Sequence, residues 1–290
     1  MIDANATWID LPEEGVLAVR GADARKFLNG QLSQQLLTLG PAETTLAGLH
    51  NPQGRTIALL RIVADGPQDL LCVLPQSLLE VVLALLRKYL LRSKAVLSNE
   101  SSLWRVQGRW PAAGAAKTAT PLSWPHTGDG RWMRLAPADS PPSQLDPPPS
   151  SELAVWHRAD IAAGLPRIYP ATQSEFVAQM LNLDVLGGIS FNKGCYTGQE
   201  VIARAHFRGR VKRRLQRFAV PAEAIDKATF VPGAGIVLAD GREATLVDCA
   251  AAHEGRVEFL AVARYDAAPS DSPGLPTISL PLPYELPAAE

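Results

Sequence analysis

The 290-residue chain has few cysteines, no strong charge of either sign and no long apolar run. Its three cysteines form no C-x-x-C pair, which argues against a disulfide framework and against a structural zinc site. Free thiols suit a reducing compartment. The histidines lack metal-ligand spacing, so we expect no metal site. They lie at positions 50, 126, 157, 206 and 253.

A formal net charge of -1 excludes a global attraction to nucleic acid or to membranes, so an anion-binding surface must be a local patch. The longest apolar helical stretch, 78–91, is interrupted by Glu80, Arg87 and Lys88, which indicates an amphipathic helix rather than a membrane span. Residues 1–5 carry no basic segment, so we expect no signal peptide and a cytoplasmic location. The sequence also lacks the G-x-S-x-G, P-loop and dinucleotide-binding motifs.

Strand and helix signals alternate over the first third of the chain. Asp23 is the expected N-cap of one helix, and Ser77 with Glu80 has the spacing of a capping box that opens a second helix, to about Leu91. Asn51–Gly54 has the residues of a type I turn and predicts a hairpin. Strands are expected at 15–20, 46–50, 55–63, 70–74, 95–97 and 103–107. This order predicts an antiparallel sheet with helices on one face.

The middle of the chain, 111–151, is rich in proline, alanine, glycine and serine, with one expected strand at 132–135. A helix follows at 152–163, with Gly164 and Pro166 as stop signals. The remaining expected elements are a short helix or turn at 175–181 and strands at 215–220, 235–238, 244–250, 256–262 and around 278. Short strands separated by glycine turns are typical of a small β-barrel or sandwich.

We therefore expect an α+β fold with three domains. The first, 1–110, is an α+β module. The second, 111–210, is a shortened module that contains the proline-rich segment, and the third, 211–290, is a C-terminal β-barrel.

One octet, Lys193-Gly194-Cys195-Tyr196-Thr197-Gly198-Gln199-Glu200, combines several signals. Thr197 and Glu200 have capping-box spacing, which predicts a helix start there. Cys195 then lies just before a helix N-terminus, where unpaired N–H groups and the helix dipole favour a thiolate. Lys193 adds a cation. The pattern suits a reactive or ligand-contacting thiol, and it also suits a small buried cysteine beside a helix start.

The octet resembles the K-G-C-Y-x-G-Q-E motif of the YgfZ family, and the likeness extends over 186–204. This resemblance implies a folate-binding body like that of the glycine-cleavage T-protein. It also implies a role in the assembly or repair of iron–sulfur clusters, which indirectly supports cluster-dependent enzymes, including those that modify tRNA. The implied cofactor is tetrahydrofolate or a derivative, and the implied partners are iron–sulfur proteins or assembly factors.

The resemblance also assigns candidate residues. Cys195 is the characteristic cysteine of the family, and its thiol has three open roles: contact with folate, with a metal or cluster intermediate, or with a redox partner. Trp156, which precedes an A-G-x-P turn, is implied as an aromatic folate contact. The family's second tryptophan has no counterpart, because Glu14 and Gly15 occupy its place.

Four other residues of the octet are candidates with simpler alternatives. Lys193 either acts on the thiol or an anion, or is a solvated loop residue. Tyr196 either stacks on a ligand ring or packs under the helix start. Gln199 and Glu200 match the donor and acceptor pattern of a pterin edge, although capping alone also explains Glu200.

A basic run follows the octet and contains no acidic residue. Its members are Arg204, Arg208, Arg210, Lys212, Arg213, Arg214 and Arg217. They suit the glutamate tail of a folate, with Arg204, Arg208 and Arg210 as the anion ligands, or the phosphates of an RNA. Only Phe207 and Phe218 accompany them, which is sparse for single-stranded RNA recognition.

Two alternative functions stay open. The first is a folate-dependent aminomethyltransferase. The T-protein carries an acidic pair after this hairpin, whereas Ala58 and Leu59 stand at the matching positions here and cannot transfer a proton. The second is an RNA-binding module that uses the run from Arg204 to Arg217.

Overall fold

The computed structural model describes residues 8–41, 43–111, 122–140, 150–209, 211–264 and 274–287, in two compact units. Unit 1 comprises Met1–Leu49, Ala58–Leu153 and Asn192–Tyr196. Unit 2 comprises His50–Ile57, Ala154–Phe191 and Thr197–Glu290. The boundary divides the octet between Tyr196 and Thr197. The three domains drawn from the sequence stay a prediction.

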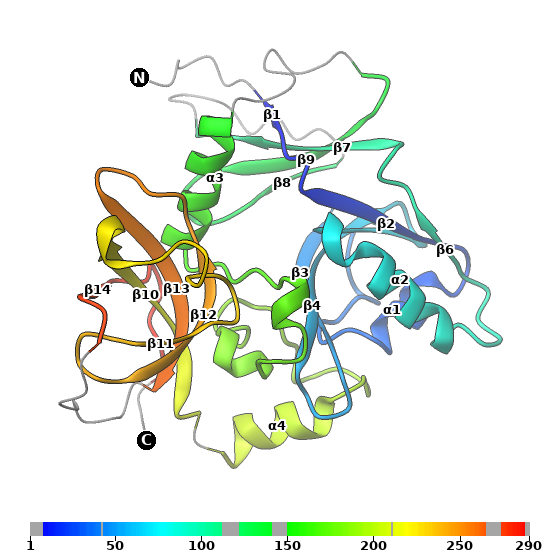
Figure 1. Ribbon diagram of the computed structural model, residues 1–290. Helices are drawn as coiled ribbons and strands as arrows, with labels where there is room; N and C mark the ends of the chain where they lie inside the picture. Colours follow the sequence, from blue (N-terminus) through cyan, green and yellow to red (C-terminus); the bar gives the residue numbers. More distant parts are fainter. Residues whose placement is uncertain are drawn as a thin grey trace. The chain divides into compact units, whose positions relative to one another are not determined.

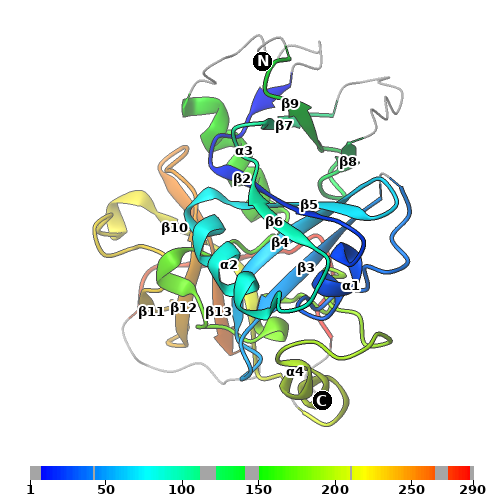
Figure 2. The same cartoon turned by 90° about the vertical axis from the view of Figure 1, so that its right-hand side faces the viewer.

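Unit 1 contains a five-stranded sheet with the strand order β3-β4-β5-β2-β6 (Figure 1). Its strands are β2 (Glu14–Arg20), β3 (Thr44–His50), β4 (Thr56–Asp65), β5 (Asp69–Pro75) and β6 (Val96–Asn99). The pairs β4–β5, β5–β2 and β2–β6 are antiparallel, as predicted. Helices α1 (Ala24–Asn29) and α2 (Gln76–Tyr89) pack on this sheet (Figure 2).

Helix α2 is amphipathic, which explains how it packs. Its buried residues follow the helical period and form one apolar stripe. They are Leu78, Leu79, Val82, Leu83 and Leu86. Arg87 and Lys88 are exposed in the last turn, where cations complement the helix dipole. Among the helices that the structure describes, none is long and apolar enough to cross a membrane.

A second, four-stranded sheet of unit 1 has the order β1-β7-β9-β8. Its strands are β1 (Ile9–Asp10), β7 (Trp104–Arg109), β8 (Ser123–Pro125) and β9 (Trp132–Pro137). The strand expected at 132–135 is confirmed as β9. The strand expected at 103–107 exists as β7, but it pairs with β1 and β9 rather than with the first sheet. The single sheet that we predicted for the first module is therefore wrong.

Unit 2 contains the sheet β11-β12-β13-β10-β14, short helical turns, one complete helix and most of another. The strands are β10 (Arg213–Pro221), β11 (Gly235–Val237), β12 (Glu243–Cys249), β13 (Arg256–Arg264) and β14 (Ile278–Leu280). The helical elements are α3 (Ser150–Ala162), η1 (Pro170–Thr172), η2 (Ala178–Leu181), α4 (Gln199–Phe207) and η3 (Ala222–Ala224). Over the described residues, no pairing joins the edge strands β11 and β14, so a closed barrel is not confirmed.

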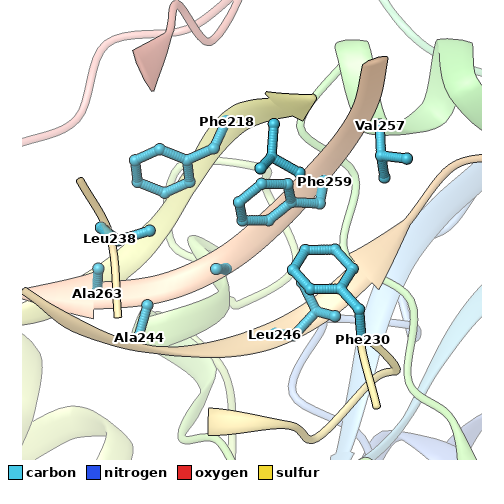
Figure 3. Packing of buried hydrophobic residues seen from close by; sticks show 10 residues of the cluster. Phe218, Phe230, Leu238, Ala244, Leu246, Val257, Phe259 and Ala263 are labelled. Carbon is cyan, nitrogen blue, oxygen red and sulfur yellow. The ribbon is translucent and has the colours of Figure 1, made fainter. Parts of the chain in front are cut away.

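The core of the unit 2 sheet is built around three phenylalanines (Figure 3). The rings of Phe218 on β10 and Phe259 on β13 have centroids 5.5 Å apart, and Phe230 meets Phe259 edge to face at 5.1 Å. Aliphatic residues such as Leu246 and Val257 complete the cluster. Such aromatic pairs stabilise a core beyond their buried area.

Neither capping box predicted from the sequence forms. Helix α4 starts at Gln199 with Gly198 as its N-cap, so Thr197 lies outside it, and no side chain caps it. Gly198 has a φ of 82°, which ends the helix on its N-terminal side. Helix α2 starts at Gln76, so Ser77 lies inside the helix, and the Glu80 carboxylate accepts a hydrogen bond from a strand residue instead.

The hairpin turn Asn51–Gly54 packs against the start of α4, and both belong to unit 2. The Asn51 carbonyl oxygen accepts a hydrogen bond from the Gly54 amide (2.9 Å), which closes the predicted turn. A Cβ on Gly198 would lie 2.5 Å from that oxygen and 3.0 Å from the Gly54 Cα. Glycine is therefore required at 198 for both its backbone conformation and its lack of a side chain.

We expect Gly198→Ala to lower the free energy of unfolding by about 1–3 kcal/mol, because alanine adds strain at positive φ and a clash with backbone atoms. Urea denaturation measures the change. Gly194→Ala is the matched control from the same octet, since a Cβ there meets no atom within 4 Å. Equal stability of the two variants would contradict the role of the turn contact.

Candidate functional site

Lys193 is the most highly coordinated side chain of the octet. Its Nζ donates hydrogen bonds to the carbonyl oxygens of Asn29 (2.6 Å), Leu32 (2.6 Å) and Gln34 (2.8 Å). An ammonium group has three donors and no acceptor, so these three carbonyls satisfy it fully. The segment 193–196 is thereby anchored to the C-terminal end of α1 and to the loop that follows it, within unit 1.

Burial lowers the pKa of Lys193 from 10.5 to about 8, so the ammonium is the major form at neutral pH. The Lys193 Nζ also lies 5.0 Å from the centroid of the Tyr196 ring, which is a cation–π distance. Tyr196 is only 7% exposed, and desolvation raises the pKa of its phenol to about 12. The structure thus brings these two candidates together and buries Tyr196.

Cys195 is exposed, unlike the other two thiols. Cys72 on β5 is fully buried, and desolvation raises its pKa to about 12. Cys249 on β12 is half-buried, and desolvation followed by the charge of Asp248 raises its pKa to about 11. At neutral pH both groups are thiols, and Cys195 is the most exposed of the three cysteines.

Gln199 and Glu200 begin α4 in unit 2. Gln199 is half-buried, whereas the Glu200 side chain is 87% exposed. Glu200 pairs with Arg204 one turn later (3.3 Å), and exposed pairs of this kind contribute little stability. Both residues therefore present polar groups at the start of α4.

Trp156 lies on α3 and is 5% exposed. Its neighbour His157 connects α3 to β12, because its Nε2 lies 2.9 Å from Asp248 Oδ2. The Tyr169 hydroxyl donates to the other oxygen of Asp248 (2.7 Å). This histidine–aspartate–tyrosine network fixes the helix that carries Trp156.

The network was not predicted, although His157 adjoins a candidate residue. Burial acts to lower the pKa of His157, but the hydrogen bond and the negative charge of Asp248 outweigh it, so the pKa is raised. No sequence signal pairs a histidine with an aspartate 91 positions away. Only the signal of Trp156 could have drawn attention to its neighbour.

In the described part of the basic run, some cations form ion pairs and others are exposed. Arg214 is buried and forms an ion pair with Asp184 (2.8 Å), and Arg217 pairs with Glu258 (2.5 Å). Together with Arg204, three of the predicted cations are neutralised by acids that lie elsewhere in the sequence. Arg208 is exposed, and Arg210 lies outside the described residues.

The candidate residues therefore form separate groups: 193–196 in unit 1, the start of α4 in unit 2, and Trp156 on α3. Within the described ranges, no three histidine, cysteine or carboxylate side chains cluster to hold a metal ion. The assignments of these residues to folate, anion or thiol chemistry stay predictions.

The chain matches no family model. It is 33% identical over 246 residues to a protein of Enterobacter sp. named "tRNA-modifying protein YgfZ", covering 77% of this chain and 74% of that one. A protein of Escherichia coli O139:H28 with the same name is 30% identical over 244 residues, covering 77% and 74%.

Among solved structures, the glycine cleavage system aminomethyltransferase T from Bartonella henselae superposes with a TM-score of 0.67 at 14% identity. The match covers 89% of this chain and 78% of that one. It shows a shared α+β fold, as the sequence predicted.

We expect Lys193→Met to lower the free energy of unfolding by about 1–3 kcal/mol, because three carbonyl oxygens lose a charged donor. Urea denaturation measures this. Lys88→Met, at an exposed position of α2, is the control and should change stability by less than about 0.5 kcal/mol.

The rate of Cys195 alkylation by iodoacetamide, measured on the folded variant, separates the two roles of Lys193. A wild-type rate supports an anchoring role alone. A slower rate would show that the ammonium acts on the thiol.

Proposed function

The chain belongs to the YgfZ family, and on that premise we propose that it binds a reduced folate and assists the assembly or repair of iron–sulfur clusters. Through those clusters it supports cluster-dependent enzymes, including tRNA-modifying ones, which agrees with the name of its relatives. The thiols of such a protein stay reduced in the cytoplasm.

The observation that carries the proposal is the exposure of Cys195 within a firmly anchored segment. Lys193 fixes the backbone two residues before it, and the buried Tyr196 fixes the backbone directly after it. An exposed thiol on a held backbone meets a ligand or partner without first being ordered. Cys72 is buried and Cys249 is half-buried, so neither thiol is as accessible as that of Cys195.

The structure supports the proposed folate contacts to different degrees. The amide of Gln199 and the carboxylate of Glu200 supply hydrogen-bonding groups for a pterin edge. Trp156, at 5% exposure, suits a wall of a binding cavity better than an open stacking platform. Its support by the His157–Asp248 contact favours a fixed wall.

The structure offers no support for the aminomethyltransferase alternative. Ala58 and Leu59 lie on β4 and are 0% and 8% exposed, where apolar side chains contribute to a core. Neither holds an amine or transfers a proton. The fold shared with aminomethyltransferase T therefore carries no matching acid at these positions.

We expect 5-formyltetrahydrofolate to bind the wild type and to bind Trp156→Phe at least about tenfold more weakly, because a smaller ring covers less of the ligand. Isothermal titration calorimetry measures both. Trp124→Phe is a matched control, since Trp124 is equally buried (2% exposed) but belongs to unit 1. Unchanged affinity of the Trp156 variant would remove this residue from the proposed site, and absence of binding to the wild type would refute the folate proposal.

We expect Cys195→Ser to fold normally and to lose the function in cells, because the thiol is exposed and contributes nothing to the core. The assay is complementation of a strain that lacks its own relative, read as the content of tRNA nucleosides made by cluster-dependent enzymes. Cys249→Ser is the control thiol variant and should complement. Full complementation by Cys195→Ser would overturn the assigned role of the thiol.

A further inference from the structure

Asp248 is a buried carboxylate on β12 that receives three hydrogen-bond donors within unit 2. The Nε2 of His157 lies 2.9 Å from its Oδ2, while the Tyr169 hydroxyl (2.7 Å) and the backbone amide of Cys249 (2.9 Å) donate to its Oδ1. The register of β12 with β13 shifts just before Asp248, and bulges of this kind change the direction of a side chain. Asp248 is only 1% exposed, so these donors replace water around the carboxylate.

His157 is the donor of this network whose charge changes near neutral pH. Desolvation, followed by the charge of Asp248, raises the pKa of Tyr169 far above its ordinary value of 10, so the hydroxyl keeps its proton. The donor of Cys249 is a backbone amide, which carries no charge. Burial acts to lower the pKa of His157, but the hydrogen bond and the charge of Asp248 outweigh it, so this pKa lies above 6.5.

Two further charges act on the His157 ring. Asp160, one turn later on α3, raises the pKa of His157, and Arg167, in the segment after α3, lowers it. Each of these effects is smaller than that of Asp248. Among the charged groups around the ring, Asp248 therefore has the largest influence on its protonation.

The ring of His157 exchanges its proton with solvent on the side that faces away from Asp248. Its Nδ1 has no hydrogen-bond partner among the described residues, and the side chain is 33% exposed. A neutral ring that donates through Nε2 therefore gains or loses its proton at Nδ1 while the contact with Asp248 persists. The charge of the donor changes, and a hydrogen bond between two charged groups is stronger than one from a neutral donor.

This contact attaches α3 to β12, and α3 also carries Trp156. Trp156 directly precedes His157 on the helix and is 5% exposed. A stronger attachment raises the share of molecules in which the helix, and Trp156 with it, is held in place. Ligand affinity at a site increases with the share of molecules that are competent to bind.

We propose that the contact between His157 and Asp248 is a pH-sensitive attachment of α3, which tightens as the pH falls and thereby strengthens ligand binding at Trp156. The effect on ligand binding rests on the folate function proposed above. Because the pKa of His157 is raised in the folded chain, the stabilisation is fully present below pH 6.5 and is lost as the pH rises through that raised pKa.

NMR of the full chain tests the titration directly, by following the Cε1 resonance of His157 from about pH 5 to about pH 9. His157→Gln identifies this resonance among those of the five histidines. We expect a midpoint above 6.5 in the wild type and a lower midpoint in Asp248→Asn, because the amide has a similar shape and no charge. A wild-type midpoint at or below 6.5, or one that Asp248→Asn leaves unchanged, would overturn the proposal.

Urea denaturation at about pH 6 and about pH 9 tests the attachment itself. His157→Gln keeps a neutral N–H donor but gains no charge at low pH. The wild type should be the more stable of the two at the lower pH, and the ratio of their folding equilibrium constants should fall at least about threefold at the higher pH. A ratio that stays constant would contradict the pH-sensitive attachment.

His253→Gln is the matched control for both pH values. His253 also belongs to unit 2, but its side chain is 55% exposed and its acidic neighbour Glu254, at 3.7 Å, is exposed as well. Exposed pairs of this kind contribute little stability. The control variant should therefore keep the pH dependence of the wild type.

Isothermal titration calorimetry with 5-formyltetrahydrofolate tests the effect on ligand binding. The wild type should bind at least about threefold more tightly at about pH 6 than at about pH 9, whereas His157→Gln should bind equally at both. Equal affinity of the wild type at the two pH values would overturn the effect on the ligand and leave the folate function standing. Absence of binding at both would instead refute the folate function, and the urea and NMR measurements would then decide on the attachment alone.

Discussion

The octet depends on one buried ammonium group. Lys193 donates hydrogen bonds to the carbonyl oxygen of Asn29, the last residue of α1, and to those of Leu32 and Gln34 in the segment after it. Burial disfavours the charged form of Lys193, so the ammonium group needs the hydrogen bonds that the three carbonyl oxygens accept from it. These bonds hold the segment in one arrangement. The exposure of Cys195 and the burial of Tyr196 both follow from a backbone that is fixed in this way.

Local signals predicted most of the elements, because short-range physics determines them. The turn Asn51–Gly54 forms as its residues predict, and the apolar stripe of α2 is buried as its period predicts. The sheet to which each strand belongs was harder to predict, since β7 follows β6 in the chain yet pairs in another sheet. That choice depends on partners such as β9, which lie more than twenty residues away.

The sequence supplied the candidate residues of the site but did not predict which other residues they contact. Capping-box spacing failed at α4 because Gly198 adopts a left-handed conformation against the hairpin turn, a constraint that comes from Asn51 and Gly54. The basic run appeared uniform because its acids, Asp184 and Glu258, lie outside it in sequence. Long-range ion pairs therefore decide which cations of the run are neutralised, and local sequence patterns do not show those pairs.

The ion pairs of Asp184 and Glu258 also determine which cations of the basic run are neutralised. Asp184 and Glu258 neutralise Arg214 and Arg217 on β10, whereas Lys212 and Arg213 at the start of that strand are exposed. Cys195 belongs to unit 1, whereas this charge belongs to unit 2. A substitution that affects one group therefore need not affect the other, although α4 begins only three residues after Tyr196.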